Sequence, residues 1–253
     1  TIIKKNIVII LILLLALFIR AYKISDTPAL NSDEAALAYN AYSLIQTGKD
    51  EHGNSFPLHF KSFGDYKPGG YVYLALPFVK TIGLTPLAVR LPNLVLSTLA
   101  VLFLYKLILL LTKSSTLALL TAVLLAISPW HIHFSRGAWE SSTALSFIIF
   151  AVFFFYQYLK KHQVKYGLVS VFFFLAATYT YRSARIISPL LLLTLFLQNK
   201  RVLLKKTKHL LVIIIFGALL ALPVAISFLN SGGTTRLGGV GITADPGPLS
   251  RSH

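Results

Sequence analysis

The chain has 253 residues, of which 55% are hydrophobic and 13% are charged, and its mean hydropathy is +0.71. This composition is too apolar for an ordinary soluble domain. The formal net charge is +16, but the lysines gather at the ends of apolar segments, which argues against a nucleic-acid-binding surface. Cysteine is absent, so neither a disulfide framework nor a cysteine-based metal site can form.

Long apolar segments predict about seven membrane-spanning helices, because a span needs about 20 mostly apolar residues. These segments are Asn6–Ala21, Leu87–Leu111, Thr116–Pro129, Ser142–Leu159, Gly167–Thr180, Ile186–Leu197 and His209–Leu229. A helix satisfies its own backbone hydrogen bonds in lipid, so the expected fold is an all-α polytopic transmembrane bundle. We expect residues 1–253 to form one domain, with the first segment retained as a signal anchor. The missing initiator Met and the Gly-rich end suggest an N-terminal fragment, truncated in an outer loop.

The lysine clusters predict the topology of this bundle. They lie at residues 4–5, 106–113, 160–165 and 200–208, at alternate ends of the spans. The positive-inside rule places all four in the cytoplasm. The outer side then holds a first loop of residues 23–85, residues 130–141, residues 182–185 and the tail after residue 229.

The first outer loop is unusually acidic. It contains six of the eight acidic residues of the chain, which are Asp26, Asp33, Glu34, Asp50, Glu51 and Asp65. Asn31 or Ser32 predicts the start of a helix that runs through Gln46 and stops at Gly48. An apolar stripe at Leu37, Ala41, Leu44 and Ile45 favours an interfacial helix that lies on the bilayer.

Asp33 and Glu34 would lie in the first turn of that helix, at the membrane–water boundary. Acidic residues in a first turn also complement the helix dipole, so the pair alone does not establish a function. Farther along, Tyr66 and Lys67 precede Pro68-Gly69-Gly70, where regular structure breaks. A short apolar run over residues 72–79 predicts a second juxtamembrane helix; the alternative for this region is a turn with an exposed lysine.

Arginine is concentrated on the predicted outer side. Seven of the eight arginines lie there, namely Arg20, Arg90, Arg136, Arg182, Arg185, Arg236 and Arg251. A guanidinium suits phosphate, which suggests an anionic substrate that approaches from the outer leaflet. The alternative is snorkelling at the interface, and for Arg20 and Arg90 we favour it.

Two further outer loops carry candidate substrate-binding residues. Arg182 and Arg185 interrupt an apolar stretch, although a tight hairpin between spans would also explain them. Arg136 and Glu140 are four residues apart and would pair on a helix, although we favour a substrate role for one of them. His131 and His133 would share a metal ion on a strand but would face apart on a helix.

The ordered set of these segments resembles the polytopic glycosyltransferases of the GT-C fold that use polyprenyl-phosphate sugars. The resemblance rests on the Asp33-Glu34 pair, the Tyr66-Lys67-Pro68 turn, Ala88-Val89-Arg90-Leu91-Pro92, Ser128-Pro129-Trp130-His131 through Glu140, and Tyr181-Arg182-Ser183-Ala184-Arg185. It is nearest to the group of protein O-mannosyltransferases and lipid A aminoarabinose transferases. One departure is Gly69-Gly70, where the commoner pattern has a second proline and a bulkier residue.

This resemblance implies a role for each matching residue. Asp33 would be the general base on the acceptor hydroxyl and Glu34 its partner, while Lys67 would contact the donor phosphate. Arg136, Arg182 and Arg185 would contact phosphate or acceptor, and Glu140 would be the acidic residue of the second loop. No cofactor is certain, and a divalent metal is left open.

The sequence therefore predicts an inverting glycosyltransferase of the inner membrane that acts on its outer face. Its partners would be a polyprenyl-phosphate-linked sugar, a glycan, lipid or protein acceptor, and membrane lipids, without nucleic acid. One alternative is a transporter or flippase for an anionic lipid, although such proteins usually carry ionisable residues within their spans. Another is a non-catalytic scaffold, which would leave the clustered carboxylates unexplained.

Overall fold

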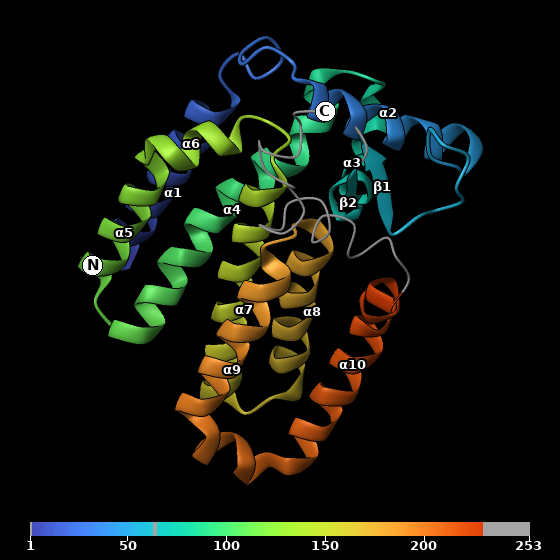
Figure 1. The fold of residues 1–253 in the computed structure, drawn as a ribbon. Coiled ribbons are helices and arrows are strands. Elements are labelled where there is room, and N and C mark those ends of the chain that lie inside the picture. Colours follow the sequence, from blue (N-terminus) through green and yellow to red (C-terminus); the bar gives the residue numbers. More distant parts are fainter. Residues whose placement is uncertain (1, 63–64, 230–253) are drawn as a thin grey trace, which may run out of the picture.

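The computed structural model describes residues 2–62 and 65–229, and it is almost entirely helical (Figure 1). The elements are α1 (Ile2–Ala21), α2 (Ser32–Thr47), β1 (His59–Ser62), β2 (Asp65–Pro68), α3 (Gly70–Ile82), α4 (Pro86–Thr112), α5 (Ser115–Ile127), α6 (Pro129–Ser135), α7 (Glu140–Lys161), α8 (Val164–Thr180), α9 (Ala184–Leu203), η1 (Leu204–Lys206) and α10 (Thr207–Leu229). The predicted all-α class is confirmed. The short antiparallel hairpin β1–β2, which pairs Phe60 with Lys67, was not predicted.

Six of the seven apolar segments each lie within one helix, and Thr116–Pro129 covers α5 and reaches the first residue of α6. The helices differ in length. Three ranges are long and apolar enough to cross a membrane, namely Pro86–Thr112, Glu140–Lys161 and Ala184–Ser227. A fourth is added if α5 and α6, which meet at a bend of 57°, count as one broken span. Ile7–Ala21 and Val164–Thr180 are shorter apolar helices. Seven complete crossings therefore remain a prediction.

The helices run between two chemically different ends. The turns α4–α5, α7–α8 and α9–α10 all lie on the lower side in Figure 1, and three lysine-rich stretches (residues 106–113, 160–165 and 200–208) lie in or beside them. We call this the basic end. Helices α2 and α3 and the hairpin lie at the opposite end, which we call the loop end. The lysine pattern thus corresponds to one physical end of the bundle.

Helix α2 begins and ends as its sequence predicts. The Asn31 side chain accepts a hydrogen bond from the Glu34 amide, and the Glu34 carboxylate accepts one from the Asn31 amide. This reciprocal cap satisfies two amides that the first turn would otherwise leave unpaired. Gly48 closes the helix at φ 70°, in the left-handed conformation that glycine adopts without a steric penalty.

The apolar stripe of α2 faces protein and not lipid. Leu37, Ala41 and Leu44 are buried in a cluster with residues of α3, the start of α4 and β1, and Ile45 packs against it. The predicted contact of this stripe with the bilayer is therefore wrong, because α3 and α4 cover it. Tyr39 and Tyr42 lie on the exposed face of α2.

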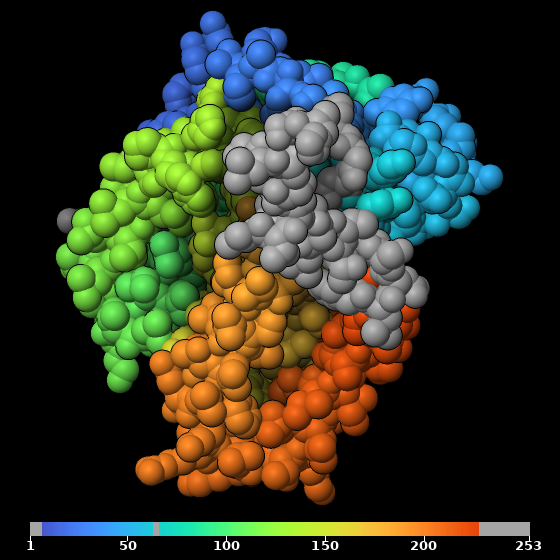
Figure 2. Space-filling model, viewed as in Figure 1, coloured from blue at the N-terminus to red at the C-terminus, as the bar shows by residue number. Residues whose placement is uncertain are grey.

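Among the three long apolar ranges, the one formed by the last two helices is the least buried. Helix α10 packs against α8, and α8 also contacts α9. Figure 2 shows a hollow between the orange surface of α9 and the red-orange surface of α10. The predicted outer tail, with Arg236 and Arg251, lies outside the described residues.

Candidate active site

Neighbours in sequence, Asp33 and Glu34 have opposite environments. Successive residues of an α-helix point about 100° apart, so they do not share a face. Glu34 is buried, with 1% of its surface exposed. The Asp33 side chain is 45% exposed. Only Asp33 is therefore accessible to a substrate in this structure.

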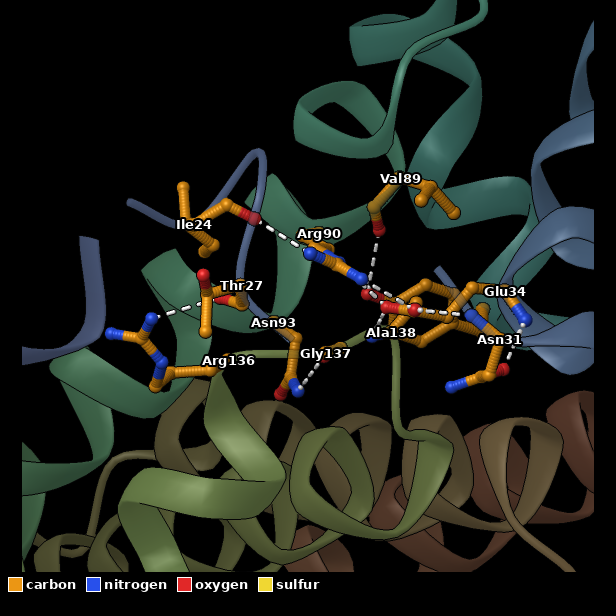
Figure 3. A network of polar contacts seen from close by, with 11 residues as sticks. Ile24, Thr27, Asn31, Glu34, Val89, Arg90, Asn93, Arg136, Gly137 and Ala138 are labelled. Atoms are coloured by element: carbon orange, nitrogen blue, oxygen red, sulfur yellow. Dashed lines mark hydrogen bonds and ion pairs between the residues drawn. The ribbon is translucent and has the colours of Figure 1, made fainter. Parts of the chain in front are cut away.

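Glu34 forms a buried two-pronged ion pair with Arg90 of α4 (Figure 3). Arg90 Nε donates to Glu34 Oε1 at 2.8 Å, and a terminal guanidinium nitrogen donates to Oε2 at 2.7 Å. Burial alone would raise the pKa of Glu34, but hydrogen bonds from Arg90, Ala138 and Asn31 outweigh it and lower the pKa. Glu34 therefore stays ionised and fully paired.

The Glu34–Arg90 pair joins four chain segments. Arg90 also donates to the Ile24 carbonyl oxygen at 2.7 Å, beyond the end of α1. The Ala138 amide, in the loop before α7, donates to Glu34 Oε1 at 2.8 Å. Asn93 of α4 holds the same loop by donating to the Phe134 and Gly137 carbonyl oxygens, both at 2.7 Å. The predicted snorkelling of Arg90 is therefore wrong, because its guanidinium points into protein.

Arg20 is likewise fully buried instead of reaching the interface. It donates to the carbonyl oxygens of Ala16, Leu125 and Ala126 and to Nδ1 of His131, at 2.7–3.2 Å. The Leu125 and Ala126 carbonyls belong to the last turn of α5, where carbonyls lack partners within the helix. The snorkelling expected for Arg20 is also wrong, and the residue fastens the bend between α5 and α6.

Asp33 of α2 forms an ion pair with Lys67 of strand β2. Lys67 Nζ donates to Asp33 Oδ1 at 2.6 Å, and the lysine side chain is 27% exposed. A small pocket beside the pair is lined by both residues, by Lys61 and by apolar side chains such as Phe60 and Val72. Glu140, at the start of α7, interacts electrostatically with Lys67 and Asp33. This pair joins a carboxylate and a cation in an accessible position at the loop end.

Two glycines let the hairpin approach its neighbours closely. A Cβ atom on Gly70 would lie 2.6 Å from the Tyr179 carbonyl oxygen at the end of α8. One on Gly69 would lie 2.5 Å from the Phe60 ring. The departure at Gly69-Gly70 from the resembled pattern therefore has a local reason, since larger residues would displace the turn that directly follows Lys67 and Pro68.

Arg182 and Arg185, from the α8–α9 connection, bind the hairpin. Arg182 donates to the carbonyl oxygen of Tyr66. Arg185 donates to Nε2 of His59 at 2.6 Å. Burial and the neighbouring charges of Arg185 and Arg182 lower the pKa of His59 to about 4, so His59 is neutral at neutral pH. Arg182 therefore reaches β2, the strand that holds Tyr66 and Lys67, and Arg185 reaches the paired strand β1.

Arg136 lies apart from this group. It donates to the Ile19 carbonyl oxygen at 2.7 Å and to the Thr27 carbonyl oxygen at 2.8 Å. Figure 3 shows its side chain directed toward Thr27 and away from Glu34. The anticipated i, i+4 contact with Glu140 is replaced by these bonds to the end of α1 and the linker that follows it.

The two histidines of the second loop do not converge. His131 is buried against Arg20, whereas His133 is exposed on α6. Within residues 2–62 and 65–229, no three His, Cys, Asp or Glu side chains gather in a group that could hold a metal ion.

The structure thus brings together most of the predicted residues. Tyr66 and Lys67 lie in the hairpin, and the residues that interact with it are Asp33, Glu140, Arg182 and Arg185. Glu34 and Arg136 instead hold other segments in place. Sequence reasoning missed the importance of Arg90 and His59. The sequence did contain a signal for Arg90, because a charged residue at the start of an apolar segment needs a partner. It contained no signal for His59, which is a single histidine in a polar loop.

Comparison with known families agrees with this architecture. Residues 67–226, more than half of the chain, match the model of a family described as dolichyl-phosphate-mannose-protein mannosyltransferase. The match begins at Lys67 and includes Arg90, Glu140, Arg182 and Arg185, while Asp33 and Glu34 precede it. Neither a curated protein nor a solved structure matched the chain.

Proposed function

This chain belongs to the dolichyl-phosphate-mannose-protein mannosyltransferase family and is a membrane glycosyltransferase of the mannosyltransferase type, and we propose that Asp33 is its catalytic base. The donor in this proposal is a polyprenyl-phosphate sugar, and the acceptor is a hydroxyl group at the outer face of the inner membrane. The observation that carries the proposal is the accessible Asp33–Lys67 pair at the loop end, where a carboxylate meets a cation beside two arginines.

Asp33 suits the role of base because its carboxylate lies beside a cation and is reachable from solvent. The acceptor oxygen attacks the anomeric carbon while Asp33 takes the hydroxyl proton. The bond between that carbon and the phosphate oxygen breaks, and its electron pair leaves with the polyprenyl phosphate. A single displacement of this kind inverts the anomeric centre.

Lys67 suits the departing phosphate, which gains negative charge as the bond breaks. Arg182 holds β2, the strand that contains Lys67, and Arg185 holds the paired strand β1, so both add positive potential there. In an in-line displacement the base and the leaving group lie on opposite faces of the sugar. Because Lys67 cannot contact both groups at once in that arrangement, its ion pair with Asp33 is replaced by an ion pair with the donor phosphate when the donor binds. Asp33 is then free to accept a proton.

Glu34 has a different part in this proposal. Its two oxygens are occupied by Arg90, Ala138 and Asn31, so it is poorly placed to take a proton from a substrate. We assign it the positioning of Asp33, because it fixes the first turn of α2 against α4 and against the loop before α7. Glu140 opens α7 two residues after Ala138, whose amide is one of these contacts.

A transporter of an anionic lipid is the second candidate, and one assay separates the two. The purified chain is reconstituted in liposomes with a radiolabelled polyprenyl-phosphate mannose and a soluble hydroxyl acceptor. We expect labelled glycoside with inverted configuration and release of polyprenyl phosphate. Movement of intact donor between leaflets without breakage of its sugar–phosphate bond would support transport and contradict the proposal.

A further inference from the structure

A second pocket lies at the basic end, at the opposite end of the bundle from Asp33. It measures about 370 Å³ and lies between the last turns of α4 and α7. Helix α4 contributes Lys106, Leu109 and Leu110, and α7 contributes Phe153, Gln157 and Lys160. These residues follow i, i+3, i+4 and i, i+4, i+7 spacing, so each helix presents one face to the pocket.

The pocket has a charge that its own neighbours do not neutralise. Lys106 and Lys160 are both exposed. The ammonium of Lys106 lies 5.5 Å from the centre of the Phe103 ring, which orients it without cancelling its charge. No acidic side chain lines this pocket among the described residues. Two cations on one small opening favour an anionic ligand.

Gln157 supplies a second, independent indication of a ligand. Its Oε1 atom is buried and has no hydrogen-bond partner in the part of the chain that the structure describes. A buried acceptor without a donor costs free energy, so such an atom requires an explanation. A hydroxyl group on the ligand would satisfy it once the Gln157 side chain turns this atom toward the pocket.

We propose that this pocket binds the headgroup of an anionic phospholipid that carries free hydroxyls, such as phosphatidylglycerol. The phosphate lies between Lys106 and Lys160, a glycerol hydroxyl donates to Gln157, and an acyl chain follows the apolar wall of Leu109, Leu110 and Phe153. The basic end is the end that the lysine pattern assigns to the cytoplasmic leaflet, whose surface is negatively charged. This site is independent of the transfer reaction at the loop end.

The test measures lipid binding by the purified chain in neutral detergent with native mass spectrometry. Phosphatidylglycerol and phosphatidylcholine are titrated separately, and glycerol 1-phosphate is added as a soluble competitor. The pocket variant is Lys106→Gln/Lys160→Gln. Its matched control, Lys205→Gln/Lys206→Gln, removes two exposed charges from the same end without altering the pocket.

We expect phosphatidylglycerol to bind more tightly than phosphatidylcholine. Binding of phosphatidylglycerol should be about 30-fold weaker in the pocket variant and unchanged in the control. Gln157→Glu is expected to weaken binding as well, since it adds a negative charge beside the phosphate. An equal loss of phosphatidylglycerol binding in both double variants would indicate a general attraction of anionic lipid to the basic end, and would contradict a specific site in this pocket. Full competition by glycerol 1-phosphate would show a soluble phosphate ligand and overturn the assignment to a lipid.

Discussion

At the scale of single residues, the decisive feature is the division of work between Asp33 and Glu34. One is buried and saturated with hydrogen bonds, and the other is exposed beside a lysine. Sequence alone could place both residues in the first turn of a helix, but it could not predict which of the two carboxylates would form the ion pair with Arg90. That choice depends on how α2 rotates against α4, a long-range packing effect.

Glu34→Gln is expected to destabilise the protein strongly. The change leaves the Arg90 guanidinium buried without its counter-charge, which costs on the order of 3 kcal/mol. Thermal denaturation in detergent should show a clearly lowered midpoint. Asp26→Asn, which neutralises an exposed carboxylate in the linker before α2, should leave the midpoint unchanged. Equal denaturation midpoints for Glu34→Gln and wild type would show that the Glu34–Arg90 ion pair contributes little to the stability of the fold.

His59 should make stability depend on pH. Its pKa is lowered to about 4 in the folded protein by burial and by Arg185 and Arg182, against an ordinary value of 6.5 when unfolded. The unfolded chain therefore binds a proton first as the pH falls, so stability decreases from about pH 6.5 down to about pH 4. His59→Gln keeps an acceptor for Arg185 but cannot titrate there. Denaturation midpoints measured across this range should fall less in the variant, and identical slopes would contradict the assignment.

At the scale of elements, the hairpin β1–β2 and the glycine turn that follows it place Lys67 beside Asp33 of α2 and Tyr66 within reach of Arg182, just beyond α8. The break at Pro68-Gly69-Gly70 was predictable from composition, and so were the cap at Asn31 and the stop at Gly48. The two strands were not, because four-residue strands carry too little alternation to be recognised. The apolar stripe of α2 was predicted to contact lipid because a helix face that packs against protein and one that lies on a bilayer are composed of the same apolar residues.

Gly70→Ala tests the close approach of the turn to α8. The added methyl would lie 2.6 Å from the Tyr179 carbonyl oxygen, so the hairpin must move away. Overpacking of this kind costs about 1–3 kcal/mol, and displacement of Lys67 should also weaken donor binding. The control is Gly217→Ala in α10, where a Cβ approaches only the Val171 side chain, at 3.0 Å. Comparable donor affinity in Gly70→Ala and the control would contradict this account of the turn.

At the scale of the whole molecule, the bundle separates a basic end from a loop end that holds the candidate active site. The lysine pattern predicted this separation, because each cluster falls at a helix terminus that the fold collects on one side (Figure 1). The number of crossings is less accessible from sequence. Helices such as α5 and α8 are shorter than a full span, so hydropathy cannot tell a tilted crossing from a partial one.

The absence of cysteine allows a direct test of this topology. Ser55→Cys places a thiol on the exposed loop after α2, and Lys165→Cys places one at the start of α8, near the basic end. An impermeant maleimide added to intact cells should label only Ser55→Cys. It should label Lys165→Cys only after the membrane is opened. Labelling of both variants from the same side would overturn the assignment of the two ends to opposite faces.

The central claim is that Asp33 removes the acceptor proton, and single-turnover transfer with Asp33→Asn tests it most directly. Saturating polyprenyl-phosphate sugar is bound first, acceptor is added, and the rate of glycoside formation is compared with wild type and with Asp26→Asn. Loss of a general base is worth about 10² to 10⁴ in rate. We predict a fall of that size in Asp33→Asn, retained donor binding, and a wild-type rate in Asp26→Asn. An unchanged rate in Asp33→Asn would contradict the account.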